Sequence, residues 1–198
     1  MTKLSREQRR LQLLAMAEEI VRDEGTNALT LVRLAERAEV SRPIAYDHFK
    51  TREGLLMALY QRYDEMIGQN IRDALPGDSA SLDEVVSVIC TAYIDGVLAA
   101  GPQCDAVYAA LAGHPETRAF LRSSRQFYVS QMQAALARFA DLSGRKDRAV
   151  LVGFLGVIEA VARDAADRRL SRAAAIDGAT AVIVGGLRNR VAVKSGRG

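Results

Sequence analysis

The chain has 198 residues, a formal net charge of +3 and a hydrophobic fraction of 49%, which are ordinary values for a globular protein of one or two domains. Its two cysteines exclude a disulfide framework, and the charged amino-terminal segment MTKLSREQRR excludes a secretory signal. The most apolar run, residues 150–162, contains Glu159 and is too short to span a bilayer, so we expect a cytoplasmic protein.

Apolar residues recur at helical spacing along the chain, and no convincing alternating strand pattern appears. A first helix is expected at Ser5–Asp23, because Gly25 just beyond it is a typical helix stop. A short helix follows at 30–38, with Thr30 as its N-cap. A tight turn then leads into a second short helix that begins after Ser41.

A longer helix is expected at 52–75, with Thr51 as its N-cap. The later helices are expected at 81–99, 103–112, 115–142, 147–169 and 172–192. The total is about nine, and the predicted fold class is therefore all-α.

The two short helices and the tight turn between them predict a helix-turn-helix, whose second helix enters the major groove of double-stranded DNA. Packing through Val40, Ile44 or Ala45, and Phe49 would leave the opposite face open for polar side chains. Ser41 is expected to cap this helix. The side chains that could donate hydrogen bonds to DNA from this helix and just beyond it are Arg42, Tyr46, His48, Lys50 and Arg52. Arginine reads guanine edges, while lysine and tyrosine suit phosphate oxygens.

The segment EEIVRDEGTNALTLVRLAERAEVSRPIAYDHFKTREGLLMALYQR (18–62) resembles the DNA-binding region of the TetR family of transcriptional regulators. The features shared with the family are Gly25, Thr30, Ala38 to Val40, Tyr46, Phe49, Arg52-Glu53 and Leu55-Leu56. The resemblance implies a DNA-binding three-helix bundle at 1–52 and an effector-binding and dimerisation domain at 53–198.

The resemblance also implies roles for single residues. Thr30 is expected to touch phosphate; Arg42, Pro43 and Ile44 are expected to face base edges; Tyr46, His48 and Arg52 are expected to hold the sugar-phosphate backbone. The chain departs from the family at Glu39, where a glycine is usual. A glutamate there costs about 1 kcal/mol if its backbone is left-handed.

The middle helices combine apolar bulk with a few polar tips, which suits a cavity for a small, mostly apolar effector. The candidate pocket residues are Cys90, Tyr93, Val97, Cys104, Tyr108, Phe120, Phe127, Tyr128 and Met132. An ordinary helical core has the same composition, so that alternative stays open, as does redox sensing by the cysteines.

The last two helices are apolar around much of their circumference, and a helix with two apolar faces needs two partners. One partner is the chain's own domain, and we expect the second to be another copy of the chain. The resemblance implies the same homodimer. The candidate interface residues are Phe154, Leu155, Ile158, Val161, Ala179, Ile183 and Leu187.

Motifs of enzymes are missing from the sequence: there is no Walker loop, no G-x-S-x-G and no HExxH. The two histidines, His48 and His114, have no third ligand at metal spacing, so neither a metal nor a cofactor is expected. The resemblance implies instead a ligand-responsive transcriptional regulator, which we expect to be a repressor that a small apolar molecule releases from a palindromic operator. The alternatives are a helical DNA-binding module without ligand control and an all-helical enzyme.

Overall fold

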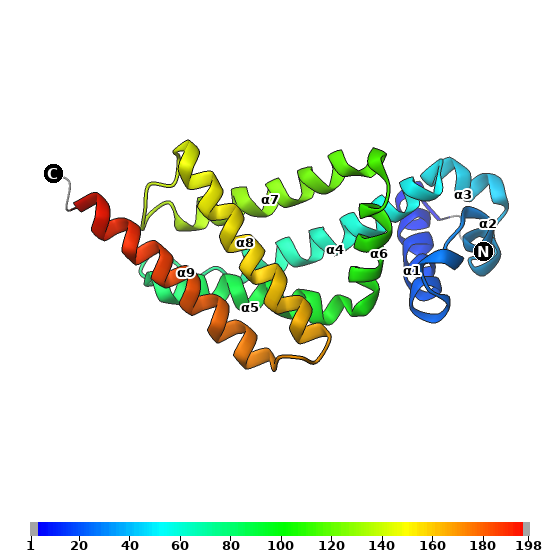
Figure 1. Cartoon of the computed structure of the whole chain (residues 1–198). Helices are drawn as coiled ribbons and strands as arrows, with labels where there is room; N and C mark the ends of the chain where they lie inside the picture. The colour runs from blue at the N-terminus through cyan, green and yellow to red at the C-terminus, as the bar shows by residue number, and fades with distance from the viewer. Residues whose placement is uncertain (1–3, 196–198) are drawn as a thin grey trace. The chain divides into compact units, whose positions relative to one another are not determined.

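The computed structural model describes residues 4–195, with side chains described as far as Asn189. Within that range the chain forms nine α-helices and two 3-10 helices, and no strand (Figure 1). The elements are α1 (Arg6–Glu24), η1 (Thr26–Ala28), α2 (Leu31–Arg37), α3 (Arg42–Phe49), α4 (Arg52–Ala74), α5 (Leu82–Ala100), α6 (Pro102–Ala112), η2 (Pro115–Thr117), α7 (Arg118–Leu136), α8 (Arg145–Ala166) and α9 (Arg172–Ser195). The predicted all-α fold is confirmed.

The amino-terminal helices begin where side chains cap them. The Ser5 hydroxyl accepts a hydrogen bond from Gln8 N at 3.1 Å, and Thr30 Oγ1 accepts one from Arg33 N at 3.1 Å. Thr51 Oγ1 does the same for Gly54 N at 3.0 Å, at the start of α4. These bonds satisfy donors that the first helical turn leaves without partners, which is why local sequence predicted the starts.

The prediction that α7 reaches Leu142 is wrong, because the helix ends at Leu136. Leu142 is only 4% exposed, and its carbonyl accepts a hydrogen bond from Gln133 Nε2 at 3.0 Å. Arg138 donates to the carbonyl oxygens of Gly77 and Ala80. Burial of Leu142 and these bonds to distant backbone outweigh the helical pattern of the segment.

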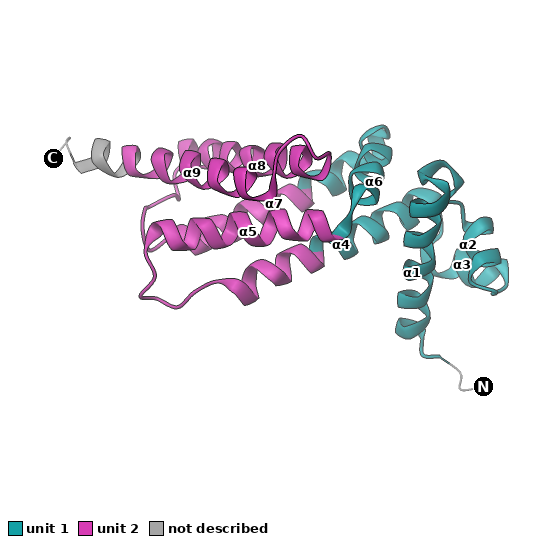
Figure 2. Ribbon diagram, turned by 90° about the horizontal axis from the view of Figure 1, so that it is seen from below, with its two compact units in different colours: residues 1–64, 100–122 teal, residues 65–99, 123–198 magenta. Residues whose placement is uncertain are grey.

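The chain divides into two compact units (Figure 2). One unit contains the chain up to Asp64 together with Ala100–Arg122, and the other contains Glu65–Ala99 and the chain from Ser123 onward. The division falls inside α4 because Leu55, Leu56 and Leu59 are buried in the first unit's core with α1, α2 and α3. The expected functional boundary between residues 52 and 53 stays a prediction.

The second unit packs α5, α7, α8, α9 and the later part of α4 around one core. Two glycines permit close helix contacts there. A Cβ at Gly96 would lie 2.6 Å from Ile67 Cγ1, and a Cβ at Gly68 would lie 2.8 Å from Phe127 Cε1. Side chains at these positions would force the helices apart.

Among the described helices, no single one has both the length and the apolar composition needed to cross a membrane. Only α5 and α6 taken together, as a bent pair, meet those two criteria.

Candidate nucleic-acid interface

Helices α2 and α3 form a helix-turn-helix joined by residues 38–41. Glu39 has a φ of 52°, so its backbone adopts the left-handed conformation. Val40 N donates to Ala35 O at 3.0 Å, and Ala38 N donates to Leu34 O at 2.9 Å. These bonds end α2 in a compact turn. The left-handed backbone of this turn is strained at Glu39, whereas a glycine would adopt it without strain.

Helix α3 is anchored by one face and exposed on the other. Phe49 is 4% exposed, as predicted, and of the two alternatives Ile44 and Ala45 it is Ala45 that is fully buried. Ile44 is half-buried and packs against the same core. The exposed side chains of α3 and its two flanking residues are Ser41, Arg42, Pro43, Tyr46, Asp47 and Lys50. We call this set the recognition face.

Five of the nine predicted DNA-contacting residues therefore lie on the recognition face, and Thr30 is exposed at the start of α2. Ser41 occupies the N-cap position of α3, but its hydroxyl makes no capping hydrogen bond. Ile44 and His48 are half-buried, so less of each side chain is open to a partner.

Arg52 is engaged inside the first unit. Its Nε donates to Leu29 O at 2.9 Å, and its Nη2 donates to Thr26 O at 2.7 Å. These bonds tie the start of α4 to the segment before α2. The guanidinium thus holds the helix-turn-helix in place, a role that the local sequence pattern did not reveal.

The amino-terminal turns of α1 lie beside α3. Arg6 Nη2 is 3.4 Å from Asp47 Oδ2, and the Arg10 guanidinium carbon is 5.2 Å from the centre of the Phe49 ring. Burial, with a smaller effect from the Arg6 charge, lowers the pKa of His48 below its ordinary value. Arg6 and Asp47 therefore lie close together beside α3, and neither is among the nine residues predicted to contact DNA.

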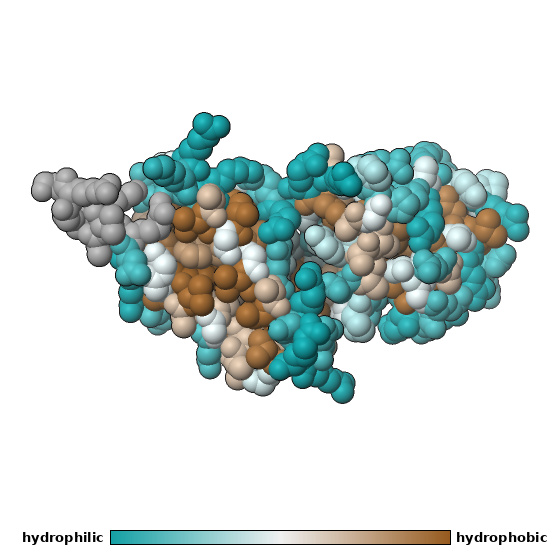
Figure 3. Space-filling view, viewed as in Figure 1, coloured by the Kyte–Doolittle hydropathy of each residue, from teal (hydrophilic) through white to brown (hydrophobic). Residues whose placement is uncertain are grey.

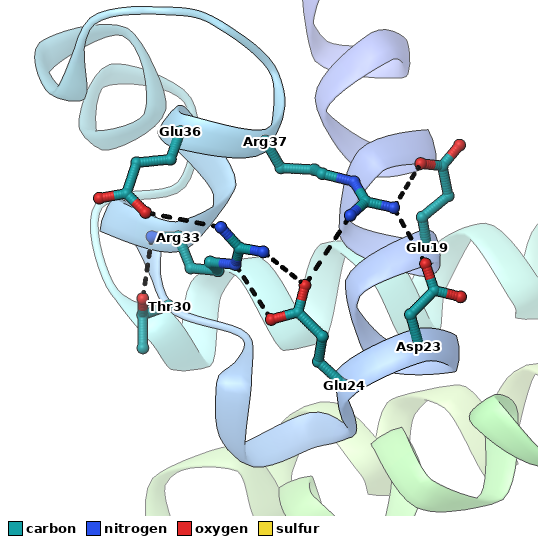
Figure 4. Close-up of polar contacts among 7 residues, drawn as sticks. All are labelled: Glu19, Asp23, Glu24, Thr30, Arg33, Glu36 and Arg37. Atoms are coloured by element: carbon teal, nitrogen blue, oxygen red, sulfur yellow. Dashed lines mark hydrogen bonds and ion pairs between the residues drawn. The ribbon is translucent and has the colours of Figure 1, made fainter.

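An ion-pair network attaches α2 to the end of α1 (Figure 4). Arg33 donates two hydrogen bonds to Glu24, at 2.8 and 3.0 Å, and these bonds lower the pKa of that carboxyl. Arg37 lies 2.9 Å from Asp23 and 3.4 Å from Glu19. Because both arginines are held by carboxylates, they position α2 rather than add to the recognition face.

The predicted pocket residues lie in two different cores. Six of them are in the second unit's core: Cys90, Tyr93, Val97, Phe127, Tyr128 and Met132. The other three, Cys104, Tyr108 and Phe120, pack in the first unit. A single pocket inside either unit cannot contain all nine.

The second unit encloses a small apolar cavity. Its lining residues are Ile71, Ile89, Tyr93, Tyr128, Gln131, Met132, Leu155 and Ile158. The space is about 10 Å³, roughly what one water molecule needs, so the cavity must widen before it can hold an effector.

Neither cysteine is a reactive thiol in this conformation. Burial raises the pKa of Cys90 to about 11. Burial, together with the nearby carboxylates of Asp64 and Asp105, raises the pKa of Cys104 to about 12. Since the thiolate is the reactive form, these environments disfavour redox sensing. In the part of the chain that the structure describes, no group of three metal-ligating side chains is present.

The predicted dimer residues are mostly internal to the chain. Six of them are at most 7% exposed and belong to the second unit's core: Phe154, Leu155, Ile158, Ala179, Ile183 and Leu187. Val161 is half-buried against the same core. Periodicity had shown that α8 and α9 each have two apolar faces, but it could not show which face turns inward.

The chain thus combines a helix-turn-helix, formed by α2 and α3, with a second helical unit. The second helix of the motif, α3, exposes polar side chains, as DNA-binding helix-turn-helix proteins do. Residues 13–59 match the family model described as "Bacterial regulatory proteins, tetR family". The match lies within the segment that carries the resemblance, so residues 13–59 are similar to the DNA-binding region of this family.

One curated relative is the HTH-type transcriptional activator FasR of Mycolicibacterium smegmatis. It is 38% identical over 73 residues, which span 37% of this chain and 33% of the relative's own length. The matched segment is thus about a third of that relative.

Two solved structures share the fold over most of the chain. A TetR-like transcriptional regulator from Rhodococcus sp. RHA1 has a TM-score of 0.71 and 21% identity, with 94% of this chain and 99% of that chain covered. The fatty acid degradation regulator FadR of Bacillus halodurans has a TM-score of 0.73 and 17% identity, with the same coverage. The matched family and these relatives are all described as regulators.

Proposed function

We propose that the chain is a DNA-binding transcriptional regulator that reads its operator with α3. The observation that carries the proposal is the recognition face, exposed on a helix whose other side is buried. Arg42, in the first turn, contacts a base edge, while Thr30, Tyr46 and Lys50 contact phosphates. The protein acts in the cytoplasm, where bacterial DNA is accessible.

The experiment is selection of bound duplexes from a random library by the full-length protein. A near-palindrome is expected, with half-sites one helical turn apart, because two recognition helices of a dimer lie about 34–36 Å apart. Failure to enrich any sequence over several rounds, at low and at physiological salt, would overturn the proposal.

The regulator is proposed to be a homodimer through the outer faces of α8 and α9. These faces carry exposed Val152, at 40%, and Val182, at 53%. Figure 3 shows apolar residues gathered over this part of the second unit. A Cβ at Gly153, Gly156, Gly178 or Gly185 would meet nothing within 4 Å among the described residues. Small residues on both helices allow a second copy to approach closely.

A small, mostly apolar effector is proposed to bind in the second unit at the cavity beside Tyr93 and Tyr128. The surface that these residues present to the cavity is apolar, so a ligand there is held by burial of its own apolar surface. Because the cavity must widen, binding favours a different conformation, and coupling of about 1–3 kcal/mol to DNA affinity is typical.

The effector proposal is tested by screening compounds for a rise in melting temperature and then for release of the selected duplex. Compounds that bind without changing DNA affinity would support the alternative of a DNA-binding module without ligand control. Chemical turnover of a bound compound would support the all-helical enzyme instead.

The bound regulator is proposed to repress transcription, with effector binding relieving it. Activation is the second candidate, because the relative from Mycolicibacterium smegmatis is called a transcriptional activator. A promoter fused to a reporter separates the two. Deletion of the regulator raises expression from a repressed promoter and lowers it from an activated one.

A further inference from the structure

Asp47 is the one acidic side chain on the recognition face. The DNA contacts proposed above do not include it. It lies one helical turn beyond Pro43, so the two share a side of α3, and it is next to Tyr46. Its side chain is 61% exposed. A carboxylate on a surface that meets a polyanion opposes binding unless it makes a compensating contact.

The contacts of Asp47 inside the protein are long and exposed. Its Oδ2 lies 3.4 Å from Arg6 Nη2, and its Oδ1 lies 3.5 Å from Lys50 Nζ. The Arg6 and Lys50 side chains are 76% and 71% exposed. Ion pairs of this kind contribute little to stability and exchange readily with other partners. The fold therefore does not explain the acidic residue.

Only some bases present a hydrogen-bond donor in the major groove, and a carboxylate can accept only from those. Guanine presents two acceptors and thymine presents an acceptor and a methyl group, so neither offers a donor to Asp47. Cytosine presents the N4 amino group as a donor, with no acceptor of its own in that groove. Adenine places its amino donor beside the N7 acceptor, which repels a carboxylate.

We propose that Asp47 is a specificity-determining residue that selects a cytosine in each half-site by accepting a hydrogen bond from the N4 amino group. Arg6 and Lys50, which pair with Asp47 in the absence of DNA, turn to the flanking phosphates when the protein binds. On other sequences the carboxylate finds either no donor or, at adenine, a donor beside the repelling N7 acceptor, so Asp47 also lowers non-specific affinity. The inference rests on the proposed function.

The test compares full-length wild-type protein with Asp47→Asn and Asp47→Ala on the selected operator, with every base substituted in turn at each position. Asparagine keeps the shape but adds donors, and alanine removes the acceptor. Both variants should keep the wild-type melting temperature, because the side chain is exposed. Asp73→Asn, on α4 in the second unit, makes the same change in net charge and serves as the control.

At one position of each half-site, the wild-type protein should prefer cytosine by about tenfold or more, and both Asp47 variants should lose that preference. Affinity of the variants for a scrambled duplex should rise several-fold, while Asp73→Asn leaves the base preference unchanged. A shift of equal size on all sequences, or a preference at that position for another base, would overturn the role of Asp47. Wild-type protein that prefers no sequence would instead overturn the proposed function itself.

Discussion

At the residue scale, two arginines at the starts of successive helices show how environment separates roles. Arg42 is exposed in the first turn of α3, where a long side chain can reach a base edge. Arg52 is half-buried, and its guanidinium donates to two backbone carbonyls of the same unit. Sequence alone assigned both to DNA, because residue type and spacing do not reveal which partner a guanidinium finds.

We expect Arg42→Ala to weaken binding to the selected operator by about 1–3 kcal/mol and to relax the preference at one base pair of each half-site. The reason is the loss of a bidentate contact to a guanine edge. Titrations against single-base operator variants measure both effects. An unchanged base preference would mean that α3 does not dock as proposed.

Arg52→Ala should act mainly on stability. Loss of the donor leaves the carbonyls of Leu29 and Thr26 without their charged partner, at a cost of about 1–3 kcal/mol. Denaturant unfolding measures this loss, and Arg52→Lys, which retains the charge but not the two-pronged geometry, should recover only part of it. A wild-type unfolding free energy together with a flatter salt dependence of DNA binding would assign Arg52 to phosphate instead.

At the scale of the elements, local signals predicted the helices better than their ends or their exposed faces. The hydroxyls of Ser5, Thr30 and Thr51 each accept a hydrogen bond from the backbone N–H three residues later. The starts of these helices can therefore be predicted from the local sequence alone. The end of α7 depends on the burial of Leu142, which is a tertiary effect. The inward faces of α8 and α9 were unpredictable for the same reason, since both of their faces are apolar.

The contact of α4 with α7 depends on the absence of a side chain at Gly68. A Cβ there would lie 2.8 Å from Phe127, whose ring also packs edge-on against Tyr128 at 5.4 Å between centres. We expect Gly68→Ala to lower the free energy of unfolding by about 1–3 kcal/mol through overpacking. Denaturant unfolding is the measurement.

The smaller side chain of Phe127→Leu provides the matched control. Combined with Gly68→Ala, it should cost less than the two single substitutions summed, because the added methyl then has room. Additive losses would show that the strain lies elsewhere on α4.

For the whole molecule, the outer faces of α8 and α9 decide whether two recognition helices can act together. Val182→Glu should place a charge in the proposed dimer interface and give a monomer in sedimentation velocity. Leu11→Glu is the control, because Leu11 on α1 is 51% exposed and Val182 is 53% exposed. Dimers that persist in Val182→Glu, or wild-type protein that sediments as a monomer at micromolar concentration, would contradict the proposed interface.

The central claim is that a dimer of this chain recognises a specific duplex through α3. The most direct measurement is a titration of wild-type protein into the selected duplex and into a scrambled duplex of equal length, at two salt concentrations, with stoichiometry determined by sedimentation. We predict two protomers on each selected duplex, and binding at least about a thousandfold tighter than to the scrambled one at physiological salt. Equal affinities for the two duplexes, which fall together as salt rises, would contradict the account.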